Sequence, residues 1–203
     1  MKLNIILDLD NTIVNTLPIE KAQDFMNNFH YSFYKNFFYS DVMIARPGLD
    51  EFLDWLFSNC RVSVFTHADK EYALAVINNL LLQGKKNRKL DFIYYRYHVN
   101  MGLELYNGYK DLRLIWDDYK VFDYYPSNTI IIDDNPIVKQ TNPYNTIRIY
   151  PFDASQDSIN DNHLEDVRRY IEKLILLYNK DTQNKVDIRV PILKKYGGSE
   201  NIY

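Results

Sequence analysis

Apolar and polar positions alternate along this chain in two rhythms. Short, almost continuous apolar runs are typical of strands buried on both faces of a sheet. Longer stretches with apolar residues every three or four positions are typical of helices that pack one face on such a sheet. The predicted strands cover residues 3–10, 61–67, 90–99, 129–133 and 146–152. The predicted helices cover residues 49–58, 69–83, 110–119 and 164–178.

Strands and helices that follow one another in this order predict an α/β fold with a central parallel sheet and right-handed crossovers. A chain of 203 residues is long enough for one such domain with a modest insertion. The sequence contains no internal repeat and no linker between domains. We therefore expect a single domain over residues 1–178, followed by a polar tail over residues 179–203.

Two segments break the alternation. Residues 18–38 begin with helical spacing and then become dense in aromatic side chains, within an insertion predicted at about residues 16–45. These aromatic side chains either pack against the edge of the sheet or form a docking surface for an extended peptide or a base. Residues 101–109 show the alternation of a hairpin, with glycines as its turn points.

Acidic residues stand at the ends of two predicted strands. The run IILDLDNT contains Asp8 and Asp10, and the run TIIIDDNP contains Asp133 and Asp134. Carboxylates at the end of a buried strand are destabilising unless cations compensate them. Because the carboxyl ends of parallel strands meet at one edge of a sheet, these aspartates predict a single divalent-metal site at that edge.

The composition narrows the class of protein. A formal net charge of −3 argues against a dedicated nucleic-acid binder, and no apolar stretch approaches the roughly 20 residues that a membrane span needs. The single cysteine, Cys60, precludes an intrachain disulfide and favours a reducing compartment. The chain begins directly in a predicted strand rather than in a signal peptide. We therefore expect a soluble intracellular protein, cytoplasmic or nuclear, that does not engage membranes.

Five motifs resemble, in their order, those of the haloacid-dehalogenase (HAD) phosphohydrolases. More narrowly, they resemble the FCP/SCP branch, the phosphatases of the RNA polymerase II C-terminal domain. DLDNT matches the DxDxT signature of the superfamily. The others are RPGLDEFL over residues 46–53, VFTHADKEYA over 64–73, GYKDL over 108–112 and IIIDDNP over 130–136. Together they span about residues 3–152 and are far more specific than DxDxT alone.

The resemblance implies a three-layer, Rossmann-like HAD fold with a central parallel sheet, small insertions and no large cap domain. It also implies that Asp8 is the nucleophile and forms an aspartyl-phosphate. Asp10 would protonate the leaving oxygen and later take a proton from the hydrolytic water. HAD pumps, which resemble DKTGT, lack this second acid, so the motif favours a phosphatase over a pump.

A Mg²⁺ cofactor is implied by the same resemblance, and an all-oxygen set of donors favours it over zinc. The ion would be held by Asp8, by the backbone carbonyl of Asp10 and by Asp134, with Asp133 in support. Because the sequence has Asp-Asp where the family pattern has Asp-Asn, either Asp133 or Asp134 can be the direct ligand.

The substrate phosphate would be bound by Thr66 and Lys110, again by resemblance. Thr12 lies in a loop that can cradle an anion just after the first strand. His67 either lines the pocket or is a structural histidine.

The leading hypothesis is an Mg²⁺-dependent protein serine/threonine phosphatase, because a site without a lid stays open to a phosphorylated protein or peptide. A phosphatase of nucleotides or of polynucleotide ends is an alternative that uses the same chemistry on a nucleic-acid end. A second alternative is a non-catalytic HAD-like interaction module, but such a module has no need for the complete set of charged residues.

Overall fold

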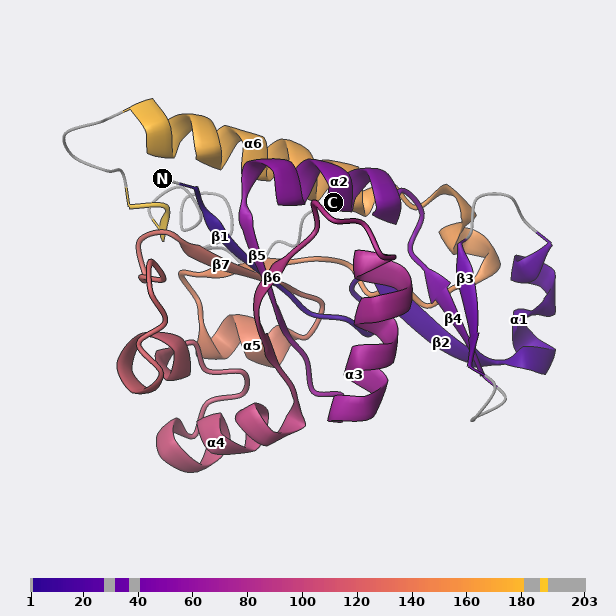
Figure 1. Cartoon of the computed structure of the whole chain (residues 1–203), viewed down its shortest axis with the longest axis horizontal. Helices are drawn as coiled ribbons and strands as arrows, with labels where there is room; N and C mark the ends of the chain where they lie inside the picture. Colours follow the sequence, from indigo (N-terminus) through magenta and orange to yellow (C-terminus); the bar gives the residue numbers. More distant parts are fainter. Residues whose placement is uncertain (1, 28–31, 37–40, 181–186, 190–203) are drawn as a thin grey trace.

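The computed structural model of the protein describes residues 2–27, 32–36, 41–180 and 187–189. Its centre is a parallel sheet of five strands in the order β6-β5-β1-β7-β8 (Figure 1). The strands are β1 (Asn4–Leu7), β5 (Arg61–Phe65), β6 (Leu90–Tyr94), β7 (Thr129–Asp133) and β8 (Thr146–Arg148). β1 pairs with both β5 and β7, so the first strand of the chain lies in the middle of the sheet. The predicted α/β fold is confirmed.

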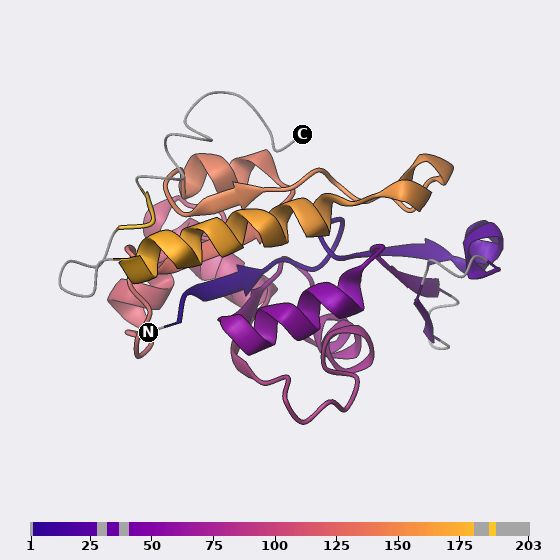
Figure 2. The same ribbon diagram turned by 90° about the horizontal axis from the view of Figure 1, so that it is seen from above.

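Each face of this sheet buries its own apolar cluster, because successive side chains of a strand point to opposite sides. Ile5 and Leu7 belong to the cluster beneath α2, α3 and α6, whereas Ile6 belongs to the cluster beneath α4 and α5. Figure 2 shows α2 and α6 side by side along the sheet. The helices are α2 (Leu49–Asn59), α3 (Lys70–Val76), α4 (Arg96–Tyr106), α5 (Pro136–Thr141) and α6 (His163–Lys180).

The predicted helices over residues 49–58, 69–83 and 164–178 are confirmed. The second is split into α3 and a turn of π-helix, η1 (Ile77–Leu82). Asp69 caps α3 as expected for an N-cap aspartate, because its Oδ1 accepts a hydrogen bond from the backbone N–H of Tyr72 at 3.1 Å. None of the helices within the described ranges is long and apolar enough to cross a membrane.

The insertion is a small antiparallel sheet, which Figure 1 shows projecting from one end of the molecule. Its strands are β2 (Val14–Pro18), β3 (Phe33–Asn36) and β4 (Asp41–Ala45), in the order β2-β4-β3. The helix predicted within residues 18–38 is confirmed only for α1 (Ile19–Met26). β2 (VNTLP) and β3 (FYKN) escaped prediction because they mix apolar and polar residues and lack the continuous apolar run that is typical of the buried strands. The aromatic residues at 30, 31 and 37–39 lie outside the described residues.

The strand predicted over residues 90–99 is wrong beyond Tyr94, and the hairpin predicted over residues 101–109 is wrong. The chain turns instead into α4. The tyrosines of this segment favour a strand by local propensity, but tertiary packing overrides it. The buried positions Val99 and Gly102 lie three apart on one face of a helix. The Nδ1 of His98 accepts a hydrogen bond from the backbone N–H of Tyr95 at 3.2 Å, which satisfies one donor at the start of α4.

The helix predicted over residues 110–119 is also wrong in its first half. Only a turn of π-helix, η2 (Leu114–Asp118), is helical, and Lys110 lies in the preceding turn with a φ of 50°. Lys110 therefore does not open a helix. Sequence reasoning missed α5 altogether, although Asn135 and Pro136 give it the usual start of a helix, a capping side chain followed by proline.

Part of the predicted polar tail belongs to the fold. α6 runs on to Lys180, and Ile188 is buried in the same apolar cluster as Ile5 and Leu7. The backbone N–H of Ile188 donates to the carbonyl oxygen of Ser127 at 3.3 Å. The rest of the tail lies outside the described residues.

Candidate active site

Three neighbouring strands deliver the predicted site residues to one edge of the main sheet. Asp8 follows β1, Thr66 follows β5, and Asp133 ends β7 with Asp134 directly after it. Because these strands are parallel and paired, their carboxyl ends meet. The backbone N–H of Asp8 donates to the carbonyl oxygen of Ile132 at 3.0 Å, which extends the pairing of β1 and β7 to the site itself.

Lys110 reaches this edge from the turn between α4 and η2. Its Nζ lies 2.6 Å from Oδ1 of Asp8 and 2.7 Å from Oδ2 of Asp133, and the residue is only 2% exposed. Burial alone would lower the pKa of Lys110, but the charges of Asp8 and Asp133 outweigh it and raise the pKa. Lys110 is therefore a permanently charged ammonium group between two carboxylates.

The turn that carries Lys110 is held by a side chain of the α5 region. The Nδ2 of Asn142 donates to the carbonyl oxygen of Lys110 at 3.0 Å, and its Oδ1 accepts from the backbone N–H of Leu112 at 3.1 Å. Lys110 and Leu112 are buried, so their backbone groups need hydrogen-bond partners, and here the Asn142 side chain supplies them in place of a helix or strand. This clamp fixes a left-handed backbone at Lys110 that is rare for a lysine.

The two aspartates after β7 have different surroundings. Both carboxylate oxygens of Asp133 are taken, one by Lys110 and the other by the backbone N–H of Asn135 at 2.9 Å. Asp134 is half-buried, and among the side chains that the structure describes, only the hydroxyl of Thr12 hydrogen-bonds its Oδ1, at 3.4 Å. Burial, followed by the charge of Asp8, raises the pKa of both carboxyls. Among this pair, Asp134 has the oxygen atoms that are available to a further partner.

The donor set fits a magnesium ion. Carboxylate oxygens of Asp8, Asp133 and Asp134 lie within 4.8 Å of one another, and among the described residues the only positive side chain hydrogen-bonded to them is that of Lys110. Three carboxylates against one ammonium leave an excess of negative charge that a cation can offset. Hard oxygen ligands without sulfur or nitrogen are those that Mg²⁺ prefers.

Asp10 has a different hydrogen-bond partner from the aspartates of this cluster. The hydroxyl of Tyr72 donates to Oδ1 of Asp10 at 2.5 Å. Burial raises the pKa of Asp10 to about 6, and the charge of Asp8 adds to the rise, although the Tyr72 hydrogen bond opposes it. A carboxyl group with such a pKa can hold a proton at near-neutral pH and also release it.

Thr66, after β5, and Thr12, in the loop after β1, are both buried. The Oγ1 of Thr66 accepts from the backbone N–H of Ala68 at 3.1 Å, which leaves its hydroxyl proton for another acceptor. The Oγ1 of Thr12 lies 3.2 Å from Oδ2 of Asp8 and accepts from the backbone N–H of Asp134 at 3.2 Å. Thr12 thus joins the loops after β1 and β7, and its contact with phosphate stays a prediction.

The loop after Asp8 is a compact turn fixed by an arginine. Three successive backbone N–H groups, those of residues 12–14, donate to the carbonyl oxygen of Leu9. The buried Arg46 donates from Nη1 to the carbonyl oxygen of Thr12 at 2.9 Å. Its Nε and Nη2 donate to the carboxylate of Asp161 at 3.0 and 2.7 Å. The sequence motif RPG therefore supports the DxDxT loop directly.

A cleft of about 430 Å³ opens over these residues. His67 is exposed at this cleft with its ring edge-on to that of Tyr109, at 5.3 Å between centroids. Sequence reasoning missed Tyr72, Arg96, Tyr109 and Asn135, all of which line the cleft or contact its acids. Tyr72 had a signal, because it lies three residues after the cap of α3 and so points back toward the strand ends.

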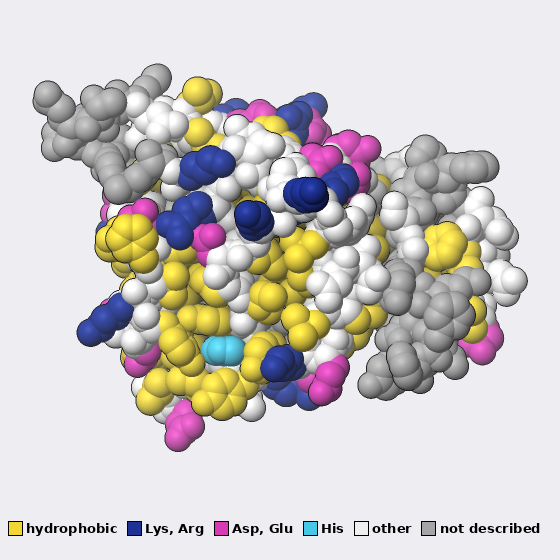
Figure 3. Space-filling view, in the orientation of Figure 1, with side chains coloured by type: hydrophobic (Ala, Val, Ile, Leu, Met, Phe, Trp, Pro, Cys, Tyr) yellow, Lys and Arg dark blue, Asp and Glu magenta, His cyan; other side chains and the backbone are white. Residues whose placement is uncertain are grey.

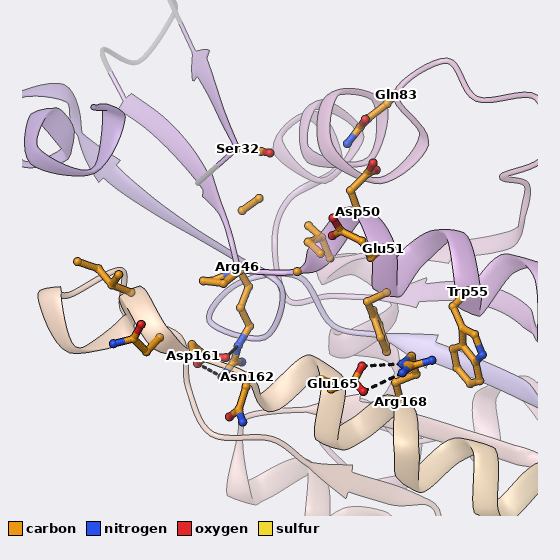
Figure 4. Close-up of a pocket in the computed structure, with 17 residues that line it drawn as sticks. Ser32, Arg46, Asp50, Glu51, Trp55, Gln83, Asp161, Asn162, Glu165 and Arg168 are labelled. Atoms are coloured by element: carbon orange, nitrogen blue, oxygen red, sulfur yellow. Dashed lines mark hydrogen bonds and ion pairs between the residues drawn. The ribbon is translucent and has the colours of Figure 1, made fainter. Parts of the chain in front are cut away.

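A larger hollow of about 820 Å³ lies elsewhere, at the start of α2 and α6 (Figure 4). Two pairs of its charged side chains neutralise each other, Arg46 with Asp161 and Glu165 with Arg168. None of the strand-end aspartates lines it. Because the predicted catalytic residues line the smaller cleft and not this hollow, we regard the smaller cleft as the candidate active site.

Comparisons with known proteins agree on one family. The family model described as NLI interacting factor-like phosphatase matches residues 3–183. CTD phosphatase-like protein 355R of Invertebrate iridescent virus 6 is 32% identical over 155 residues, covering 73% of this chain and 85% of that protein. The 355R protein of Invertebrate iridescent virus 3 is 32% identical over 178 residues, covering 83% of this chain and 94% of that protein.

Solved structures show the same fold. A structure of Fcp1, described as an essential RNA polymerase II CTD phosphatase, matches with a TM-score of 0.64 at 16% identity. A structure of fission yeast Fcp1-R271A bound to beryllium fluoride matches with a TM-score of 0.67, also at 16% identity. Both matches cover 95% of this chain and 70% of the other chain.

Proposed function

This chain belongs to the NLI interacting factor-like phosphatases and is a phosphoric monoester hydrolase, and we propose that it removes phosphate from serine or threonine side chains of proteins through an aspartyl-phosphate on Asp8. The observation that carries the proposal is the cluster of Asp8, Asp133 and the half-buried Asp134, in which the ammonium group of Lys110 contacts Asp8 and Asp133. A carboxylate attacks a phosphate dianion only where nearby positive charge offsets their repulsion, and this cluster is built around such charge.

Asp8 is the attacking group. One of its carboxylate oxygens forms a bond to phosphorus while the ester oxygen leaves with the electron pair of the broken bond. Lys110 holds Oδ1 of Asp8 at 2.6 Å, whereas Oδ2 has only the longer contact with the Thr12 hydroxyl at 3.2 Å, so we assign the attack to Oδ2. The hydroxyl of Thr66, which has an unused proton, donates to the transferred phosphoryl group.

Asp10 supplies the proton. In its protonated form it gives that proton to the leaving oxygen, so that an alcohol leaves instead of an alkoxide. The resulting carboxylate then accepts a proton from the water that attacks the aspartyl-phosphate, which returns Asp8 to its carboxylate form and releases phosphate. A pKa of about 6 suits both steps.

Asp8, Asp134 and the backbone carbonyl of Asp10 would hold Mg²⁺, with Asp133 in support. Bound there, the ion supplies positive charge to the phosphoryl oxygens. Asp133 has both oxygens engaged with Lys110 and Asn135, which favours Asp134 as the direct ligand. Asp133 then serves to orient Lys110.

A phosphoprotein is the substrate class that the cleft favours. The described residues add only the small sheet of β2, β3 and β4 with the helix α1 to the main domain, and this insertion projects away from it (Figure 1 and Figure 3). An open cleft admits a segment of a larger chain. The viral 355R proteins and Fcp1 are named for phosphatases of a C-terminal domain, which supports a serine or threonine phosphate within an extended peptide.

Turnover of phosphopeptides and of 3′- and 5′-phosphorylated oligonucleotides, measured with Mg²⁺ and with EDTA, tests this proposal. We expect hydrolysis of the phosphoserine peptides that requires Mg²⁺. Asp8→Asn should reduce kcat by at least about 10⁴-fold, since the nucleophile is lost. Asp157→Asn, at an exposed position of the chain, is the matched control and should be unaffected. Faster hydrolysis of the oligonucleotides would mean that the substrate is a nucleic-acid end and not a protein. An active Asp8→Asn variant would refute the assignment of Asp8 as the nucleophile.

A further inference from the structure

A chain of three hydroxyl and carboxyl groups links the small sheet to Asp10. The hydroxyl of Tyr72, on the first turn of α3, lies 2.5 Å from Oδ1 of Asp10 and 2.7 Å from Oγ1 of Thr16. Thr16 belongs to β2, where it pairs with Met43 of β4. Three segments that are separate in the sequence thus meet at one phenolic oxygen.

The direction of each hydrogen bond in this chain is determined. A phenol has one proton to donate, and Tyr72 gives it to Asp10, because an ionised carboxylate can only accept. The phenolic oxygen must then accept from Thr16, whose hydroxyl is the donor. Burial, reinforced by the charge of Asp10, raises the pKa of Tyr72, so the phenol keeps its proton throughout.

This chain also determines which oxygen of Asp10 can hold the catalytic proton. Oδ1 already accepts the proton of Tyr72 at 2.5 Å, so a second proton at that oxygen would face the first. When Asp10 is protonated, its proton is therefore held at Oδ2. The same hydrogen bond fixes the side-chain rotation of Asp10. A carboxyl group in the cleft without such a partner would be free to rotate.

We infer that Tyr72 is a positioning residue for this phosphatase: it holds Oδ1 of Asp10 so that Oδ2 delivers the proton to the leaving oxygen, and Thr16 of the small sheet sets the direction of its hydrogen bond. The inference rests on the proposed role of Asp10 as the general acid. It gives the insertion a part in catalysis, through Thr16 of β2.

The leaving group distinguishes positioning from mere stability. An alkoxide, the leaving group of phosphoserine, is too basic to depart without a proton, whereas para-nitrophenolate departs readily without one. Loss of a correctly placed acid therefore slows alkyl phosphates more than aryl phosphates. A general loss of folded protein would slow both to the same extent. kcat/KM is the parameter to compare, because it reports on transition-state stabilisation from free enzyme and substrate.

The experiment compares Tyr72→Phe with the wild-type protein, with Mg²⁺ present, on a phosphoserine peptide and on para-nitrophenyl phosphate. We expect kcat/KM to fall about tenfold for the peptide, as for loss of one hydrogen bond to a charged group, and by a clearly smaller factor for the aryl ester. Thr16→Val should lower the ratio of kcat/KM for the peptide to kcat/KM for the aryl ester by a smaller factor than Tyr72→Phe does. Thr16→Ser keeps the hydroxyl and should keep the wild-type ratio.

Tyr124→Phe is the matched control. The hydroxyl of Tyr124 is also shared between a hydroxyl group and a carboxylate, those of Ser63 at 2.7 Å and Asp91 at 3.0 Å, but Tyr124 does not line the cleft. Its removal should lower stability without changing the ratio of the two substrates. Equal losses on both substrates in Tyr72→Phe would overturn the inference. A wild-type protein that hydrolyses neither substrate would instead overturn the proposed function, so the two failures are distinguishable.

Discussion

Two charged clusters of this protein are built from the same residue types and behave in opposite ways. At the sheet edge, three aspartates lie close together, and one ammonium group pairs with two of them. Between α2 and the loop after η1, Asp50 and Asp54 share two cations, Lys85 and Arg88. The first cluster is short of positive charge and the second is balanced.

The pKa values follow this difference. Burial and the charge of Asp8 raise the pKa of Asp133 and Asp134 at the sheet edge. Hydrogen bonds from Arg88 and Lys85 hold the pKa of Asp54 below its usual value, and they do the same for Asp50, although burial alone would raise it. A cluster that only supports the fold neutralises itself, whereas the cluster at the sheet edge needs a further cation or a substrate to complete it.

Removing the central cation should give the largest effect. Lys110→Met leaves Asp8 and Asp133 buried without a counter-charge, so we expect the free energy of unfolding to fall by about 3–5 kcal/mol. The phosphoryl group also loses a positive charge, so kcat should fall at least about 10³-fold. Denaturant unfolding and peptide turnover measure the two quantities.

Arg88→Met is the counterpart in the balanced cluster. Arg88 is buried, but Asp50 and Asp54 have side chains that are 45% and 48% exposed, so water can solvate them when the arginine is lost. We expect a smaller loss of stability, about 1–3 kcal/mol, and unchanged kcat/KM. If Arg88→Met inactivated a folded protein, or Lys110→Met left activity intact, the division between the two clusters would be wrong.

Magnesium should stabilise the folded protein through the cluster at the sheet edge and leave the balanced cluster unaffected. An ion that binds only the folded state stabilises it by about 2.7 kcal/mol at a concentration one hundred times its dissociation constant, so Tm should rise with Mg²⁺. Asp134→Asn relieves repulsion at the sheet edge, and we expect this variant to be at least as stable as the wild-type protein without Mg²⁺ but to gain little from adding it. Asp54→Asn, in the balanced cluster, should keep the full Mg²⁺ response. A full response in Asp134→Asn would point to Asp133 as the direct ligand.

The smallest effect concerns pH. In the proposed mechanism Asp10 must be protonated to serve an alkyl phosphate, and its pKa is raised to about 6, so kcat/KM should fall by about tenfold for each pH unit above that value. The lowered pKa values of Asp50 and Asp54 act at the other end of the scale. They contribute stability above the usual aspartate pKa that is lost as pH falls through the lowered values. The Tm difference between the wild-type protein and Asp54→Asn, which isolates the balanced cluster, should therefore shrink only below the usual aspartate pKa. A Tm difference that changed over the same pH range as kcat/KM would contradict this.

The parts of the fold that sequence predicted are those in which local and tertiary signals agree. β1 and β7 are nearly pure apolar runs, and each ends in aspartate, so both the buried sheet and its acidic edge could be read directly. Cys60 is buried and its pKa is raised to about 12, mainly by burial, as expected for a small core residue rather than a reactive thiol.

The rest depended on contacts between distant residues. The tyrosines before and within α4 favour a strand by propensity, and only the packing of Val99 against the sheet decides for a helix. The left-handed backbone of Lys110 depends on Asn142, which lies 32 residues away in the sequence. The position of Tyr72 after the cap of α3 could indicate that it lies near the strand ends, but it could not identify Asp10, 62 positions away, as its partner.

The arginine that braces the DxDxT loop sets a limit on how far this protein can be trimmed. Arg46 is 1% exposed, and the side chain that neutralises it, Asp161, lies beyond the last motif of the sequence, which ends at Pro136. A fragment that stops after β8 would contain every motif yet strand a guanidinium group in its interior beside the loop of Asp8. The smallest autonomous unit therefore extends at least to Asp161, and a motif search by itself would draw its boundary too early.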